Sequence, residues 1–154
     1  MKKNFDKTLS RLAAIQSCFQ SFFDQQPLKN LEIEFNTHRF NKTLDQDKFK
    51  MKYDKALYKD LISYIENFKS NFDINEYFEK YIKLKRPFKR LDIITKVILI
   101  VGTSEILNNQ KINKKIIINE YINISKSFLD KPEVSMINAI LDKIYDNRSE
   151  KKIN

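Results

Sequence analysis

Asn119 and Glu120 are the side chains whose placement first suggests chemistry, because they interrupt an isoleucine-rich stretch, IIINEYINISKSF, at residues 116–128. A carboxylate beside a carboxamide could take part in acid–base chemistry or hydrogen-bond a ligand. The pair could equally be the solvent side of a helix whose other side is buried. Most other carboxylates of the chain lie on polar faces of predicted helices, where solvated side chains are commoner than acid–base pairs.

The residues that usually build catalytic or metal sites are scarce. The chain has one histidine, His38, and one cysteine, Cys18, which cannot assemble a cysteine-based metal site or an internal disulfide. We expect His38 in a loop and Cys18 in or beside the core. The single glycine, Gly102, excludes a glycine-rich phosphate loop, and the motifs of serine hydrolases, kinases and zinc enzymes are absent. We therefore predict a protein that is not an enzyme, with no cofactor and no metal.

Composition favours one helical domain. The 154 residues suffice for one core, and 42% of them are hydrophobic. Three prolines and one glycine are too few for the many turns of a sandwich or barrel. The formal charge of +9 suggests nucleic acid as a partner, although abundant lysine is also expected of an AT-rich genome.

The sequence also predicts a cytoplasmic protein that does not enter the membrane. The N-terminal stretch MKKNFDKTLS lacks the apolar segment of a signal peptide. The longest apolar run, VILIVG at residues 97–102, is far shorter than the ~20 residues that span a bilayer.

Apolar residues recur at helical spacing along most of the chain. The predicted helices cover residues 5–24, 52–69, 73–83, 89–108, 117–130 and 133–146, with room for one short helix within 28–50. We predict an all-α protein, a compact bundle of six to seven helices. Pro87 divides it into an N-terminal sub-bundle of residues 5–84 and a C-terminal sub-bundle of residues 88–146.

The segment 89–108 is apolar almost all round the helical wheel, which indicates a central helix wrapped by others. Gly102 within it costs roughly 1 kcal/mol of helix stability relative to alanine. We expect a close helix–helix crossing at Gly102 to compensate. Lys96 and Glu105 are expected where this helix reaches solvent.

Periodicity also answers the question of the isoleucine-rich stretch, which we predict to be an amphipathic helix ended by Pro132. Its apolar arc includes Tyr121 and Phe128. The polar arc contains Asn119, Glu120, Asn123, Lys126, Ser127 and Asp130. Asn119 and Glu120 therefore lie on the solvent face of a helix.

Three stretches together resemble the NusB family. They are RLAAIQSCFQSFF (11–23), RLDIITKVILIVGTSEIL (90–107), and the isoleucine-rich helix followed by MINAILDKIYD (136–146). Their order and spacing match the family from residue 11 to residue 143, whereas residues 25–56 carry no recognisable motif.

The resemblance implies one NusB-like RNA-binding domain over residues 1–154. NusB proteins are small all-α transcription factors that bind the boxA segment of ribosomal RNA leader transcripts together with NusE, a small-subunit ribosomal protein. That assembly joins RNA polymerase in an antitermination complex and prevents premature termination, without catalysis or a cofactor. Some members form homodimers, so a homodimer is a further expectation.

The resemblance also assigns residues. Those expected at the RNA are Lys2, Lys3, Lys7, Arg11, Gln16, Asn119, Lys126, Ser135 and Met136, with the first four contacting phosphates. Those expected at NusE are Phe19, Phe22, Phe23, Thr95 and Lys96. The chain departs from the family at Thr95, where an acidic residue is frequent, at Ile100, where arginine is usual, and at Ser135–Met136, where a Lys-Phe pair is usual.

Two other functions remain open from the sequence. NusB-like domains also serve as RNA-recognition modules of ribosomal RNA methyltransferases, an alternative that we expect less because the 154 residues contain no methyltransferase domain. A helical bundle that binds only protein is the other alternative, with its lysines explained by genome composition. For Asn119 and Glu120, a plain solvated role and an RNA-facing role both remain.

Overall fold

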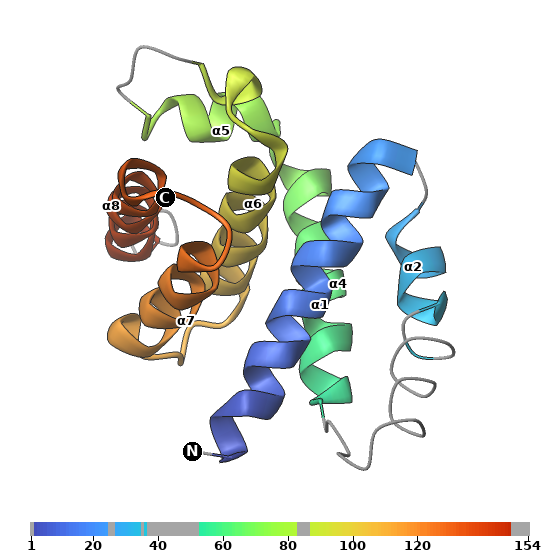
Figure 1. Cartoon of the computed structure of the whole chain (residues 1–154). Helices are drawn as coiled ribbons and strands as arrows, with labels where there is room; N and C mark the ends of the chain where they lie inside the picture. Colours follow the sequence, from blue (N-terminus) through green and yellow to red (C-terminus); the bar gives the residue numbers. More distant parts are fainter. Residues whose placement is uncertain (1, 25–26, 35, 37–52, 83–86, 149–154) are drawn as a thin grey trace. The chain divides into compact units, whose positions relative to one another are not determined.

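The computed structural model describes residues 2–24, 27–34, 36, 53–82 and 87–148 (Figure 1). Its elements are α1 (Lys2–Asp24), α2 (Leu28–Glu34), α4 (Lys55–Asn71), α5 (Ile74–Glu79), the 3-10 helix η2 (Phe88–Arg90), α6 (Ile93–Asn108), α7 (Lys114–Lys126) and α8 (Lys131–Asn147). These ranges contain no strand, which confirms the predicted all-α class. His38 lies outside the described residues.

The chain forms two compact units, Met1–Ser63 and Tyr64–Asn154, so their boundary falls within α4. The sequence had suggested a division near Pro87, at the start of η2. The first unit is built from α1, α2 and the beginning of α4. Cys18, Leu31 and Tyr58 belong to its buried residues, and the expected burial of Cys18 is confirmed.

The second unit is organised around α6, against which α7 and α8 pack (Figure 1). The residues of α6 from Val97 to Ile106 are all buried, as the apolar wheel predicted. Gly102 is the point of close approach. A Cβ atom built on it would lie 3.3 Å from both terminal methyl groups of Leu141 on α8 and 3.4 Å from the Tyr121 ring on α7. The predicted close crossing at Gly102 is confirmed.

Glu105 corrects one expectation about α6. It was expected at the solvent, but its side chain is fully buried. The Tyr121 hydroxyl donates a hydrogen bond of 2.7 Å to a carboxylate oxygen of Glu105. A buried carboxylate is tolerated when such donors replace water. Lys96, by contrast, is partly exposed at the first turns of α6.

The end of α7 corrects a second expectation. The helix stops at Lys126, and the backbone amides of Ser127, Phe128 and Leu129 then bond back to carbonyls of Ile124 and Ser125. Phe128 therefore lies beyond the end of the helix, where helical periodicity no longer places its side chain. That side chain is 52% exposed rather than buried. Pro132 does not end this helix but stands in the first turn of α8, where its missing N–H costs nothing.

Aromatic rings fill the junction between the end of α4, α5 and η2. Phe68 meets the Tyr77 ring edge-on at 5.1 Å, and the Phe78 and Phe88 rings stack at 4.5 Å with only 11° between their planes. The backbone amide of Phe88 also donates to the Glu79 carboxylate at 2.8 Å. Burial of the Tyr77 hydroxyl, reinforced by neighbouring Tyr81, raises the pKa of Tyr77 above its ordinary range. These contacts hold η2 against α5.

No helix among the described residues is long and apolar enough to cross a membrane.

We predict that Gly102→Val lowers the free energy of unfolding by about 1–3 kcal/mol, because the added methyl groups must displace Leu141 or Tyr121 in a filled core. Urea denaturation measures the change. Ala139→Val, on the exposed side of α8, is the matched control for β-branching in a helix and should cost less than about 1 kcal/mol. Equal stability of Gly102→Val and the parent chain would contradict the close packing at this position.

Candidate RNA and partner surfaces

In the first unit, hydrogen bonds fix α1 against the start of α4. The Ser10 hydroxyl donates to the Asp54 carbonyl at 2.7 Å and accepts the Asp54 amide at 2.9 Å. About two turns further along α1, the hydroxyls of Ser17 and Tyr58 share a buried hydrogen bond of 2.9 Å. Because these bonds set the rotation of α1, they decide which of its side chains reach solvent.

Lys7 and Gln16 are exposed on α1, in agreement with a surface role. Arg11 is not: its side chain is only 3% exposed, and it takes part in an interaction within the chain. The expectation that Arg11 contacts phosphate from an exposed basic face is therefore wrong for this structure. The rotation of α1 that buries Ser10 and Ala14 also turns Arg11 inwards. The side chains of Lys2 and Lys3 lie outside the described residues.

The aromatic side chains near the end of α1 differ in exposure. Phe22 is 43% exposed, whereas Phe19 is half-buried. The Phe23 side chain lies outside the described residues. An exposed phenylalanine is a typical anchor of a protein interface.

In the second unit, α7 presents a polar face. Asn119, Asn123 and Lys126 are exposed, and Glu120 is half-buried. This confirms that the polar pair of the isoleucine-rich stretch lies on the outer side of an amphipathic helix. Glu120 also makes an interaction within the chain.

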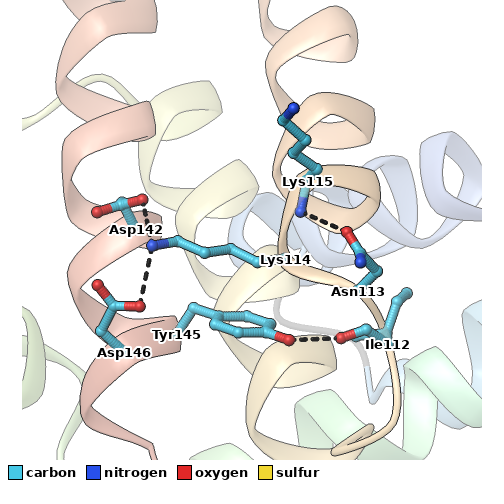
Figure 2. Close-up of polar contacts among 7 residues, drawn as sticks. All are labelled: Ile112, Asn113, Lys114, Lys115, Asp142, Tyr145 and Asp146. Carbon is cyan, nitrogen blue, oxygen red and sulfur yellow. Dashed lines mark hydrogen bonds and ion pairs between the residues drawn. The ribbon is translucent and has the colours of Figure 1, made fainter.

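Figure 2 shows how the beginning of α7 is tied to α8. The Lys114 ammonium bridges Asp142 and Asp146 at 2.8 Å and 2.9 Å, and these hydrogen bonds, that of Asp142 first, raise the pKa of Lys114. Beside them, the Tyr145 hydroxyl donates to the Ile112 carbonyl at 2.7 Å. The Asn113 side chain caps α7 by accepting the amide of Lys115 at 2.9 Å.

Arg148, at the end of α8, completes this connection. Its guanidinium donates to the carbonyls of Ile106, Asn109 and Gln110, the first and last at 3.1 Å, and lies 3.6 Å from the centre of the Tyr145 ring. Ile106 is in the last turn of α6, Asn109 is its C-cap and Gln110 follows, so the guanidinium lies at the C-terminal end of the helix, where a cation is favourable. Sequence inspection missed Tyr145 and Arg148, because no local pattern shows which carbonyls a distant side chain will reach.

The remaining predicted residues are divided between surface and core. On α8, Ser135 is exposed and Met136 is half-buried. Lys96 is half-buried, and its ammonium donates to the Lys89 carbonyl. Thr95 is only 1% exposed, so the expectation of a direct contact between its side chain and a partner protein is wrong for this structure. Its side chain lies on the apolar circumference of α6.

The described side chains include no group of histidine, cysteine and carboxylates arranged to hold a metal ion. What the surfaces offer is cations, carboxamides and an exposed aromatic ring. Such groups bind phosphates, base edges and apolar pockets of proteins.

Comparisons with known proteins place this arrangement in a family. A model described as NusB family matches residues 8–146. The "Transcription antitermination protein NusB" of Nitrobacter hamburgensis is 25% identical over 149 residues, covering 94% of this chain and 91% of that protein. The protein of the same name from Rhizobium rhizogenes is 28% identical over 135 residues, covering 88% of this chain and 82% of that protein. The solved structure of T. maritima NusB superposes with a TM-score of 0.73 at 25% identity and covers 94% of each chain.

The burial of Arg11 and the exposure of Lys7 predict opposite effects on stability. Arg11→Ala should lower the free energy of unfolding by about 1.5–3 kcal/mol, because it removes a buried charged hydrogen-bonding group. Lys7→Ala, the control on the same helix, should change it by less than about 0.5 kcal/mol. Urea denaturation measures the free energy of unfolding of both variants. If Arg11→Ala were as stable as Lys7→Ala, the Arg11 side chain would not be buried in a stabilising contact.

Proposed function

The chain belongs to the NusB family, and we propose that it acts as a transcription antitermination factor that binds the boxA segment of ribosomal RNA leader transcripts together with NusE. The family match over residues 8–146 carries the proposal, because it includes most of both compact units. The relatives reported above are named as antitermination proteins. The proposed activity is binding, with no catalytic step and no cofactor, and its place is the cytoplasm, where transcripts are made.

On the first unit, the RNA contact is electrostatic. Lys7 is exposed on α1, and Lys2 and Lys3 precede it in the same helix. Lysines of this kind neutralise phosphates and release counterions, which gives attraction that does not depend on sequence and falls steeply with salt. Arg11 has no part in this contact, since it is buried. Gln16 is exposed further along the helix and can hydrogen-bond a base or a ribose.

On the second unit, the contact is polar and more selective. Asn119 and Lys126 on α7 are exposed, as is Ser135 on α8, and Met136 is half-buried beside it. A carboxamide both donates and accepts hydrogen bonds, so Asn119 can recognise the edges of unpaired bases. Lys126 supplies a cation for a neighbouring phosphate. The packing of α7 and α8 on α6 keeps these groups in place before RNA arrives.

NusE is proposed to bind apolar and basic side chains. Phe22 is the exposed anchor, with Phe19 half-buried near it on α1, and Phe23 follows in sequence. Lys96 is the second proposed contact, on α6. In the proposed complex the chain contacts both RNA and NusE. Because the complex is held by both contacts together, neither the RNA contact nor the NusE contact has to be tight alone.

A methyltransferase module finds less support. The relatives named above are antitermination proteins, and the aligned regions cover 91% and 82% of their lengths. A bundle that binds only protein leaves the exposed lysines of α1 and α7 without a role. The RNA experiment below separates all three functions.

We predict weak binding of labelled boxA RNA to the chain alone and clearly tighter binding when NusE is present. The substitution Lys7→Glu should weaken RNA binding in both cases, because it reverses a charge next to the phosphates. Fluorescence anisotropy at several salt concentrations measures both effects.

Lys59→Glu, on the exposed side of α4, is the matched control for the change of net charge and should retain most of the affinity. If NusE produced no gain in affinity at moderate salt, the proposed function would be wrong. If Lys7→Glu and Lys59→Glu weakened binding equally, the RNA contact would not lie on α1.

A further inference from the structure

Residues 80–90, KYIKLKRPFKR, contain six basic residues among eleven and no acidic one. No residue of this run was assigned to RNA or to NusE above. Three of its basic residues are described by the structure, namely Lys80, Lys89 and Arg90, and all three are exposed. We call these three residues together with Tyr81 the α5–η2 surface.

The α5–η2 surface stands on a rigid base. Lys80 directly follows α5, while Lys89 and Arg90 belong to η2. The two elements are held together by the stacked rings of Phe78 and Phe88 at 4.5 Å and by the hydrogen bond from the Phe88 amide to the Glu79 carboxylate at 2.8 Å. Cations that are distant in sequence are therefore kept on neighbouring, fixed elements.

Within the described ranges, the charges of this surface are not used inside the protein. Among the described residues, Lys80, Lys89 and Arg90 have no carboxylate partner, whereas Lys114 is held between two aspartates. The ammonium of Lys96 donates to the Lys89 carbonyl and so brings a fourth positive charge to the same region. Unpaired cations close together repel one another, and a bound polyanion relieves that repulsion.

An aromatic ring accompanies these cations. Tyr81 is partly exposed and follows Lys80 in the chain, and its ring contacts Tyr77 at 5.5 Å with 44° between the ring planes. Cations that meet the backbone and an aromatic ring that can stack on a base are the combination by which proteins bind single-stranded nucleic acid.

A protein partner fits this surface less well. Protein interfaces are usually centred on exposed apolar anchors. The large apolar side chains exposed among the described residues are Phe5, Phe22, Ile33, Ile116 and Phe128. None of them lies on α5 or η2.

We propose that the α5–η2 surface is a second RNA-binding surface, which holds single-stranded transcript outside the boxA segment through its phosphates, with Tyr81 stacking on a base. The proposal rests on the proposed function, since it presumes that the chain binds a transcript. It adds a contact that does not depend on base sequence, and it lengthens the RNA that one molecule of this protein holds.

The test is the triple variant Lys80→Gln, Lys89→Gln, Arg90→Gln, measured with NusE against two RNAs, the boxA segment alone and the boxA segment with single-stranded flanks. The parent chain should bind the flanked RNA more tightly. The variant should bind the boxA segment as the parent chain does and lose the gain from the flanks. For the flanked RNA, the slope of log K against log salt concentration should decrease in magnitude by about 2, corresponding to three phosphate contacts on a single strand.

The control Lys29→Gln, Lys59→Gln, Lys111→Gln removes the same charge from exposed positions elsewhere and should retain the gain. Unchanged thermal unfolding confirms that both variants are folded. An equal loss in the control, no gain from the flanks in the parent chain, or an unaltered slope in the triple variant would each overturn the proposal. Loss of NusE binding by the triple variant with RNA binding intact would overturn it in favour of a protein contact.

Failure of the proposed function gives a different result. In that case NusE does not increase the affinity for boxA RNA, either of the parent chain or of any variant. The α5–η2 surface is then tested on a single strand without boxA at low salt, for which the triple variant must still bind more weakly than the control.

Discussion

The approach of α6 to α7 and α8 at Gly102 is the constraint on which the second unit depends. A Cβ atom at this position would lie 3.3–3.4 Å from Leu141 and Tyr121, so any larger side chain would have to push α7 or α8 side chains aside. The contact sets the rotation of α7, and that rotation leaves Asn119 and Lys126 outside and Tyr121 inside. A glycine within a helix costs roughly 1 kcal/mol of helix stability. The free energy gained by removing apolar surface from water at the crossing is larger than this cost.

Buried polar contacts fix the arrangement more firmly than the ion pairs at the surface. The hydrogen bond between Tyr121 and Glu105 is fully enclosed, so losing it would leave a carboxylate short of a donor where water cannot substitute. The bridge from Lys114 to Asp142 and Asp146 is exposed and screened by solvent and salt, and its effect on stability is correspondingly small. Arg148 and Tyr145 lie between these extremes, since they satisfy backbone carbonyls of α6 and of the α6–α7 connection that the helix itself leaves free.

Helical periodicity was enough to predict the main helices, the central place of α6 and the role of Gly102, because these depend on which side of each helix is apolar. It was not enough for Glu105, and the family resemblance was not enough for Arg11 and Thr95; all three are polar residues in the core. A wheel of one helix assigns polar residues to solvent, whereas their burial depends on partners from other segments. Phe128 was misplaced because the hydrogen bonds that end α7 at Lys126 leave no clear signal in the sequence. The basic run at residues 80–90 was visible, but Pro87 within it was interpreted only as a helix boundary.

In both units the core is well packed, and the groups that we propose to bind RNA and NusE are exposed or half-buried side chains outside it. The central claim is that RNA and NusE bind exposed groups and leave the buried part of α6, from Val97 to Ile106, undisturbed. Amide chemical shifts in NMR spectra, recorded before and after addition of boxA RNA and NusE, test it most directly. The account predicts shifts concentrated around Lys7, Asn119 and Lys126, with the amides around Gly102 and Glu105 unchanged. Shifts centred on the buried residues Val97–Ile106 of α6, with those of α1 and α7 unaltered, would contradict it.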